Sequence, residues 1–349
     1  MQKILAYAAQ DALSPLTPFS YSQRELATDD VAIQILFCGV CHSDLHQARD
    51  EWGGSLYPMV PGHEIVGVVT EVGSQVTTYR IGDKVGVGCM VDSCQHCASC
   101  EEDLEQYCEN GTVLTYNSVH KDGKTPAFGG YATGIVVKES FVLRMPENLP
   151  LDKAAPLLCA GITTYSPLKK WGIGPNQRVG VVGIGGLGHM GIKIAKALGA
   201  EVVALTSSPQ KEEEARRLGA DHVVVTRDPA NLTPWKNKLD FVLDTVSATH
   251  DINPLLQLLR RDGAMVLVGL PTEPLRVAAM DLVIPRRELA GSLIGGIKET
   301  QEMLDFCGQH GIVSDIEQIP IQNINEAYER MLRQDVKYRF VIDMHSLHL

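Results

Sequence analysis

Residues 178–190, RVGVVGIGGLGHM, join an apolar run to a glycine-rich turn, and this stretch decides the fold. The pattern G-x-G-x-x-G covers Gly183, Ile184, Gly185, Gly186, Leu187 and Gly188. Arg178–Val182 predicts a strand entering the turn, and Leu187–Leu198 predicts a helix leaving it. In that context the glycines allow the backbone to approach a pyrophosphate at the helix N-terminus. A glycine-rich turn without a ligand is the plainer alternative.

The residues after this turn continue the alternation of strands and helices. A helix over Lys211–Leu218 ends at Gly219, and strands are expected at Glu201–Leu205, Asp240–Thr245, Ala264–Val268 and Leu289–Ile294. Such alternation predicts an α/β domain with a doubly wound parallel sheet, the Rossmann arrangement, over residues 154–296.

The end of the second strand distinguishes the two nicotinamide dinucleotides. An NAD site places an acidic residue there to hold the ribose 2′-hydroxyl, and an acid would repel a 2′-phosphate. This chain instead has hydroxyls and a lysine, at Thr206, Ser207, Ser208 and Lys211. The sequence therefore predicts a preference for NADP(H), the alternative being an ordinary Ser/Pro loop before a helix.

The segments on either side of this α/β domain have a different residue pattern. Strands are expected at Val31–Phe37, Ile65–Val72 and Lys84–Val87, separated by glycines, which predicts a small β-barrel or sandwich over residues 1–153. Residues 297–349 begin with an amphipathic helix, Glu299–Cys307, and end in a strand, Tyr338–Asp343.

A compact cysteine cluster is the strongest chemical signal. Cys94, Cys97, Cys100 and Cys108 have the spacing C-x2-C-x2-C-x7-C. Four thiolates on one loop suit a closed tetrahedral zinc site, which is structural because no position stays open. An iron–sulfur cluster is less suited, because the ferredoxin pattern places its fourth cysteine after three residues and before proline.

A second, dispersed set consists of Cys41, His63 and Cys159. Two cysteines and a histidine with one open position form a known catalytic zinc site. Each residue alone is more typical of a buried structural side chain, and it is their occurrence beside a zinc loop that favours metal binding.

Composition excludes several classes of protein. The 349 residues carry a net charge of −11, which argues against nucleic-acid binding, and 44% are hydrophobic. No apolar run is long enough for a membrane helix, and no signal peptide is recognised, so a cytoplasmic protein without membrane association is expected. The nine cysteines favour metal or catalytic use over disulfides.

Together these motifs resemble the zinc-dependent medium-chain alcohol dehydrogenases, in the cinnamyl-alcohol-dehydrogenase-like branch that includes bacterial NADP-dependent aldehyde reductases. The matching stretches include CGVCHSDLHQ (38–47), YPMVPGHEIVG (57–67), PLLCAGITTYSPL (156–168) and DVKYRFVID (335–343). The resemblance implies a GroES-like catalytic domain of residues 1–153 with 297–349, a Rossmann domain of residues 154–296, two zinc ions per chain, and a homodimer.

The resemblance also implies roles for single residues. Cys41, His63 and Cys159 hold the catalytic zinc, and Glu64 matches a glutamate that in relatives can move onto the metal when the fourth ligand leaves. Asp44 orients the histidine ligand. Ser43, which also touches the cofactor, and His46 form a proton relay. The further expected cofactor-binding residues are Thr163, Thr245, Gly269, Ser292, Leu293, Ile294 and Arg339, the last at the pyrophosphate.

The expected substrate pocket is lined by Trp52, Cys89 and Leu114. Leu114 stands where plant lignin-pathway enzymes carry a tryptophan, and Trp52 where they carry a smaller residue, so a strict cinnamyl specificity is not implied. The expected activity is NADPH-dependent reduction of aliphatic and aromatic aldehydes. Polyol oxidation, zinc-free quinone reduction and a non-catalytic nucleotide-binding zinc protein are the alternatives.

Overall fold

The computed structural model describes residues 3–271 and 273–348. The chain divides into two compact units: unit 1 consists of Met1–Cys159 with Gly295–Leu349, and unit 2 is Ala160–Ile294. These boundaries lie six and two residues from the ones expected from the sequence.

Unit 1 is built around a seven-stranded sheet in the order β11-β5-β4-β3-β19-β18, with β10 also paired to β3. Alternate residues of β3, among them Val31, Ile33 and Ile35, are buried, as expected for a strand with one face on the core. The strands are β3 (Asp30–Gly39), β4 (Ile65–Val72), β5 (Lys84–Val87), β10 (Gly134–Lys138), β11 (Leu143–Arg144), β18 (Ile316–Pro320) and β19 (Arg339–Asp343).

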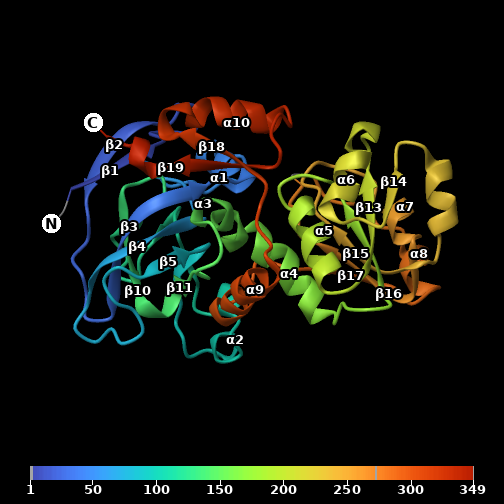
Figure 1. Ribbon diagram of the computed structural model, residues 1–349, viewed down its shortest axis with the longest axis horizontal. Coiled ribbons are helices and arrows are strands. Elements are labelled where there is room, and N and C mark those ends of the chain that lie inside the picture. The colour runs from blue at the N-terminus through green and yellow to red at the C-terminus, as the bar shows by residue number, and fades with distance from the viewer. Residues whose placement is uncertain (1–2, 272, 349) are drawn as a thin grey trace. The chain divides into compact units, whose positions relative to one another are not determined.

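The C-terminal strand β19 is an internal strand of this sheet. It pairs antiparallel with β3, with Val341 opposite Gly39, and parallel with β18. Figure 1 shows the red β19 beside the blue β3. A strand near the end of the chain therefore completes a sheet whose first strand in sequence, β3, begins at Asp30.

Short elements surround the sheet of unit 1. Three two-stranded ribbons are formed by β1 (Lys3–Ala8) with β2 (Thr17–Ser22), β6 (Met90–Asp92) with β7 (Val113–Leu114), and β8 (Ser118–Val119) with β9 (Pro126–Ala127). The helices are α1 (His42–Ala48), α2 (Ala98–Glu101), α3 (Leu151–Ala154), α9 (Ile297–His310) and α10 (Ile324–Leu332), with 3-10 turns η1 (Glu105–Tyr107), η2 (Glu139–Phe141), η3 (Ala155–Leu158), η6 (Ile321–Asn323) and η7 (Met344–Ser346).

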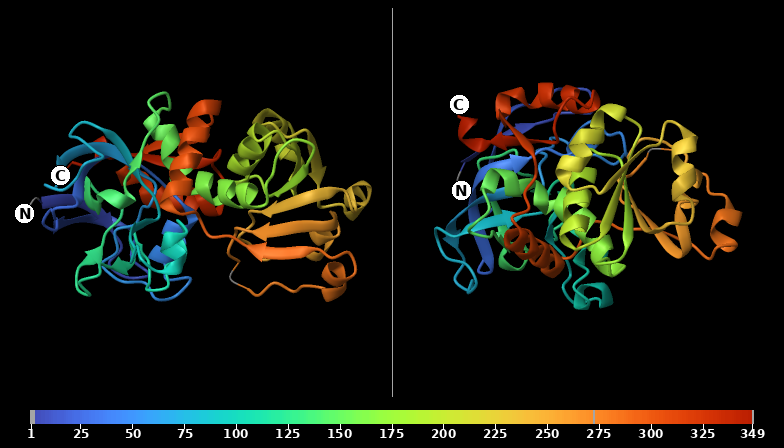
Figure 2. Two further views of the ribbon diagram at one scale, coloured as in Figure 1. Left: turned by 90° about the horizontal axis from the view of Figure 1, so that it is seen from below. Right: turned by 45° about the vertical axis from the view of Figure 1, so that its right-hand side comes forward.

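Unit 2 is a six-stranded parallel sheet in the order β14-β13-β12-β15-β16-β17. The strands are β12 (Arg178–Val182), β13 (Glu201–Thr206), β14 (His222–Val225), β15 (Leu239–Asp244), β16 (Leu259–Leu267) and β17 (Glu288–Gly291). Helices lie on both sides of the sheet (Figures 1 and 2): α4 (Ala160–Lys170), α5 (Gly188–Ala197), α6 (Glu212–Leu218), α7 (Asn253–Leu256) and α8 (Ala279–Val283), with turns η4 (Pro209–Lys211) and η5 (Pro229–Trp235).

This arrangement confirms the doubly wound sheet predicted from the sequence. The strand order reverses between β12 and β15, so the carboxyl ends of these two strands form the usual ligand-binding edge of such a sheet. Both strands are nearly all buried and rich in valine and leucine, as parallel strands covered on both faces must be.

The observed element bounds differ from the predicted ones mainly where charged residues occur. Strand β16 begins at Leu259, before the predicted Ala264, because the intervening Arg260–Asp262 hide its apolar pattern. Strand β17 ends at Gly291, earlier than the predicted Ile294. The elements that were not predicted include strands β10, β14 and β18 and helices α4 and α10. Over residues 3–271 and 273–348, no helix combines the length and apolarity that crossing a bilayer requires.

Candidate active site

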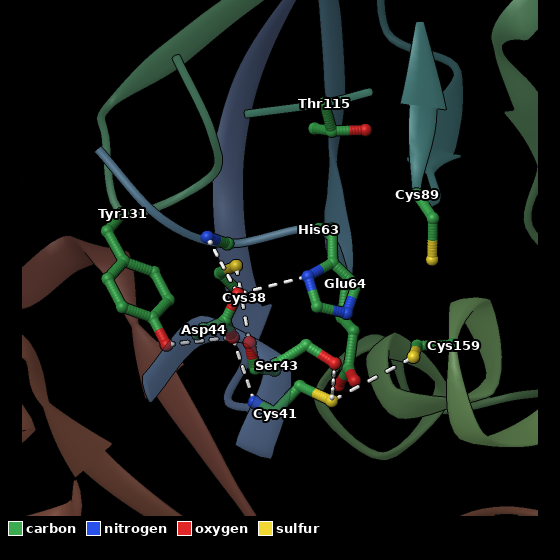
Figure 3. A network of polar contacts seen from close by, with 12 residues as sticks. Cys38, Cys41, Ser43, Asp44, His63, Glu64, Cys89, Thr115, Tyr131 and Cys159 are labelled. Carbon is green, nitrogen blue, oxygen red and sulfur yellow. Dashed lines mark hydrogen bonds and ion pairs between the residues drawn. The ribbon is translucent and has the colours of Figure 1, made fainter. Parts of the chain in front are cut away.

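Four residues of the expected catalytic zinc site meet in unit 1. Cys41 is the residue before α1, His63 and Glu64 directly precede β4, and Cys159 follows η3. All four are buried, and one ligand atom from each lies within 4.8 Å of the others. Figure 3 shows the two thiols joined by a dashed line below the His63 ring.

The spacing of the sulfur atoms fits a tetrahedral metal ion. Sulfur atoms bonded to zinc at about 2.3 Å in a tetrahedron lie about 3.8 Å apart. The Cys41 Sγ–Cys159 Sγ distance is 3.9 Å. Two soft thiolates with an imidazole are donors that zinc prefers, so the residues present fit the ion.

His63 is oriented by Asp44. Its Nδ1 lies 3.0 Å from Asp44 Oδ1, and an ionised carboxylate only accepts hydrogen bonds, so Nδ1 carries the proton and Nε2 is left for a metal. Burial lowers the pKa of His63, but the charge of Asp44 outweighs it and the pKa stands well above the ordinary value. The ring of Tyr116 stacks on the imidazole with centroids 5.7 Å apart.

Glu64 contacts Arg339, and both side chains are buried. Burial raises the pKa of Glu64 to about 7, against the opposing charge of Arg339. The position of Arg339 at a cofactor pyrophosphate therefore stays a prediction; in this structure its guanidinium is bound to Glu64 within unit 1.

The four-cysteine loop of unit 1 closes on itself. The sulfur atoms of Cys94 and Cys100 are 3.9 Å apart, and those of Cys97 and Cys108 are 4.0 Å apart. Amide groups point at the sulfurs: the Asn110 side chain donates to Cys94 at 3.3 Å and lowers the pKa of that thiol to about 5. Such donors stabilise thiolates, so this loop also fits a zinc ion, with no position left open.

The two residues of the expected relay lie on α1, one helical turn apart. Ser43 Oγ is 3.6 Å from Cys41 Sγ, which places its hydroxyl beside the ligand cluster. His46 Nδ1 is 2.5 Å from Glu51 Oε2, and its ring lies 5.1 Å from that of Trp52. Glu51 is an acidic partner that the sequence analysis did not identify.

The residues of the expected substrate pocket have different environments. The Cys89 thiol donates to the carbonyl oxygen of Leu158, the residue before Cys159, at 3.8 Å, so it lies next to the ligand cluster. Trp52 and Leu114 are 39% and 45% exposed. A cavity of about 190 Å³ elsewhere in unit 1 is lined by other side chains, including Tyr21, Arg24, His120 and Phe128.

In unit 2 the glycine-rich turn joins β12 to α5. Gly183 has a φ of +85°, which favours glycine, and a Cβ at Gly188 would lie 1.8 Å from the carbonyl oxygen of Gly183. At Gly185 a Cβ would meet nothing within 4 Å, so the turn is open there. This geometry fits a pyrophosphate held by backbone amides at the start of α5.

Lys211 reaches this turn from the end of the neighbouring strand. Its Nζ donates to the carbonyl oxygen of Ile184 at 2.8 Å. The loop before it is held by hydrogen bonds from the Ser208 amide to Thr206 Oγ1 and from Ser208 Oγ to Gln210. Ser207 is exposed, and the acidic residues Glu212, Glu213 and Glu214 follow on α6.

The other expected cofactor residues of unit 2 are placed as follows. Thr245 follows β15, and its hydroxyl donates to the carbonyl oxygen of Val182 at 2.7 Å. At Gly269 a side chain does not fit, because a Cβ there would lie 2.4 Å from the carbonyl oxygen of Val246. Ser292 donates its amide to Leu267, Leu293 is 49% exposed, and Ile294 has a left-handed φ of 39°. Thr163 is buried on α4.

Three residues of the site could not be found from motifs. Glu51 contacts His46, Tyr116 stacks on His63, and Tyr131 donates to Asp44 at 3.1 Å. Each acts on a motif residue without belonging to a motif, and no spacing signal marks it.

Comparison with protein families identifies two matching models. Residues 27–147 match the alcohol dehydrogenase GroES-like domain, and residues 186–309 match the zinc-binding dehydrogenase family. The first lies in unit 1, and the second covers most of the parallel sheet of unit 2.

Similar proteins cover almost the whole chain. An aldehyde reductase of Escherichia coli, YahK, is 57% identical, and NADP-dependent alcohol dehydrogenase C 1 of Mycolicibacterium smegmatis is 55% identical, each over 348 residues and 99% of both chains. A solved cinnamyl alcohol dehydrogenase of Sorghum bicolor is 48% identical, with a TM-score of 0.96 over 99% of this chain and 98% of that one.

Proposed function

The chain belongs to the zinc-binding alcohol dehydrogenases, and we propose that it reduces aliphatic and aromatic aldehydes to primary alcohols with NADPH. The single observation that carries the proposal is the buried set of Cys41, His63, Glu64 and Cys159, with its ligand atoms within 4.8 Å of one another. The relatives named for alcohol dehydrogenase and aldehyde reductase activity support the same reaction class.

Two bound groups supply the chemistry that side chains cannot. Zinc provides a Lewis acid that polarises a carbonyl oxygen, and NADPH provides a hydride. Cys41, His63 and Cys159 would hold the ion as two thiolates and one neutral imidazole, which balance its charge and leave one position for substrate. Glu64 stands beside them as a fourth donor, through a carboxylate oxygen.

The chain's own residues position the ligands and move a proton. Asp44 fixes the tautomer of His63 through Nδ1. Ser43 offers a hydroxyl beside the ligand cluster, because its Oγ lies 3.6 Å from Cys41 Sγ. We infer that the proton taken up by the alcohol product comes from solvent through His46, which Glu51 holds in place, and then through Ser43.

We further propose that unit 2 binds NADP(H) in preference to NAD(H). The open glycine turn suits the pyrophosphate, and Lys211, at 2.8 Å from the carbonyl of Ile184, brings a cation to the same edge of the sheet as Ser207 and Ser208. A cation and hydroxyls suit a 2′-phosphate, and no acidic side chain occurs between Thr206 and Lys211.

The chain is also proposed to carry two zinc ions, form a homodimer and reside in the cytoplasm. The two ligand clusters support the zinc count. An exposed apolar face on and beside α8, formed by Val277, Met280, Val283 and Ile284, supports self-association. All nine cysteines are free of disulfides, which suits a reducing compartment.

A substrate panel tests the proposed reaction. Purified protein is assayed for NADPH oxidation with medium-chain aliphatic aldehydes, aromatic aldehydes and quinones, and for NADP⁺ reduction with sorbitol and mannitol. We expect the aldehydes to give the highest kcat/KM, because Trp52, Cys89 and Leu114 offer few polar groups to hold a polyol. Polyol oxidation as efficient as aldehyde reduction, or binding of NADPH without turnover of any substrate, would contradict the proposal.

A further inference from the structure

Asp44 is a buried carboxylate with an unusually complete set of donors. It has no exposed surface. Its Oδ1 accepts from the Gly62 amide at 3.2 Å and lies 3.0 Å from His63 Nδ1, and its Oδ2 accepts from the Cys41 amide at 2.8 Å and the Tyr131 hydroxyl at 3.1 Å. An ionised carboxylate offers about four lone-pair sites, so all of them are filled.

Three of these donors belong to the segments that carry the proposed zinc ligands. Only Tyr131 comes from elsewhere in the chain, 87 residues from Asp44. Figure 3 shows its ring directed at Asp44 from the side opposite His63. Tyr131 is therefore the one external support of the carboxylate among the hydrogen bonds of the described residues.

Tyr131 is itself held by the segment that it supports. Its amide donates to the carbonyl of Pro61 at 2.9 Å, and the amide of Gly130 donates to Gly62 at 2.9 Å. Its carbonyl accepts from the amide of Tyr7 at 2.9 Å, and its side chain is fully buried. The hydroxyl thus has little freedom to leave Asp44.

Two other buried phenols surround the same carboxylate but do not replace this donor. Tyr116, whose ring stacks on His63, and Tyr328 are both buried. Among the hydrogen bonds of the described residues, the one from a phenol to Asp44 comes from Tyr131. The Tyr328 hydroxyl, however, makes no hydrogen bond with the residues described.

We propose that Tyr131 is a positioning residue for the catalytic metal: its hydroxyl fixes the plane of the Asp44 carboxylate and thereby aims Nε2 of His63 at the ligand cluster. The proposal rests on the zinc site of the proposed function. Loss of the hydroxyl leaves the Cys41 amide as the remaining donor to Asp44 Oδ2 and empties one buried lone-pair site. The carboxylate and the imidazole can then turn together and hold the ion less well.

The test is the rate at which each zinc ion leaves the protein. Purified holoenzyme is mixed with an excess of a chromophoric chelator, and zinc release is followed for wild type, Tyr131→Phe and Tyr79→Phe. Tyr79 is the matched control, because its buried hydroxyl also donates a hydrogen bond in unit 1, at 2.6 Å to the carbonyl of Val142, but not to Asp44. The ion of the four-cysteine loop is an internal control.

Partners that orient metal ligands typically change metal affinity by about 10–100-fold. We expect the catalytic ion to leave Tyr131→Phe about tenfold faster, and the loop ion to leave at the wild-type rate. In an Asp44→Asn background Tyr131→Phe should cause no further acceleration, because the acceptor is already altered.

Three outcomes would overturn the inference. One is release of the catalytic ion from Tyr131→Phe at the rate of wild type and Tyr79→Phe. Another is equal acceleration of both ions, which indicates general loss of stability. The third is an undiminished effect of Tyr131→Phe in the Asp44→Asn background. Absence of zinc from the Cys41 site of the wild-type protein would instead overturn the proposed function together with this inference.

Discussion

Lys211 Nζ lies 2.8 Å from the carbonyl oxygen of Ile184, so the lysine after the second strand of unit 2 reaches the glycine turn after the first. The side chain expected to recognise a 2′-phosphate and the turn expected to hold the pyrophosphate are thus one connected structure. We therefore expect a change at Lys211 to affect both proposed phosphate sites.

Cofactor choice is the first prediction. We expect NADPH to exceed NADH by at least about tenfold in kcat/KM, which corresponds to about 1.4 kcal/mol and is within the strength of one charge-assisted contact. Thr206→Asp should erase or reverse this ratio by repelling the 2′-phosphate, and Lys211→Gln should lower it. Lys236→Gln, an exposed lysine of unit 2, is the control. An unchanged ratio in Thr206→Asp would exclude the phosphate site at this strand end.

Zinc content separates the two ligand clusters. Elemental analysis should give two zinc ions per chain in wild type and about one in either Cys100→Ser or Cys159→Ser. Cys100→Ser should mainly lower the melting temperature, because a structural zinc contributes folding free energy, whereas Cys159→Ser should mainly abolish turnover. Cys307→Ala, in a buried cysteine outside both clusters, should keep two ions. One ion in a fully active wild type would contradict the two-site proposal.

The proton relay is tested at its two ends. Ser43→Ala should lower kcat about 10²–10⁴-fold, the usual contribution of positioned proton transfer, with zinc content and NADPH affinity near normal. His46→Ala should cost less, because solvent can replace the outer member. In aldehyde reduction, an added buffer acid, which can donate the proton, should recover part of the loss. Retention of most of kcat by Ser43→Ala, when chemistry is rate-limiting, would mean that the proton follows another path.

The pair of His250 and Asp244 predicts a pH dependence of stability. His250 Nε2 lies 2.9 Å from Asp244 Oδ2, and this hydrogen bond raises the pKa of the histidine. A raised folded-state pKa means that the contribution is full below the unfolded value of about 6.5 and is lost as pH rises through the higher folded value.

Urea unfolding at pH 6 and pH 9 measures this contribution. His250→Gln should lower the free energy of unfolding by about 1–2 kcal/mol at pH 6, as for a partly exposed hydrogen bond to a charged group, and by much less at pH 9. His310→Gln, at the end of α9, is the control. A difference that grows with pH would refute the assigned sign.

The apolar face beside α8 predicts the subunit contact. Val283 is 77% exposed and Met280 is 70% exposed. Burial of these apolar side chains against a second subunit would remove them from water and so stabilise a dimer. Val283→Arg should convert a dimer to a monomer in light scattering. Ile81→Arg, at a 69% exposed residue of unit 1, should leave the dimer intact. Monomeric wild-type protein, or a dimer that survives Val283→Arg, would exclude this interface.

Local motifs predicted those parts of the molecule in which neighbours in sequence are neighbours in space. The glycine turn, the four-cysteine loop, and strands β4, β5 and β12 follow from spacing and apolar pattern alone. The contact of Arg339 with Glu64 could not be predicted in this way, since it joins residues 275 positions apart, and neither could the support of Asp44 by Tyr131. Strand β18 was missed because Glu317, Gln318 and Pro320 interrupt its apolar pattern.

The internal place of β19 has a consequence for synthesis on the ribosome. Residues 160–294 are contiguous, so unit 2 has its whole sequence before the chain ends. The sheet of unit 1 is incomplete until β19 has been synthesised. This strand pairs with Cys38 and Gly39, just before Cys41. At about 5–20 residues per second the N-terminal half of that sheet is exposed for roughly 10–40 s with an open edge. Until β19 pairs, Cys38 and Cys41 lie at or beside this open edge, so we expect the cysteines of the proposed metal site to be more accessible to oxidants than in the folded chain.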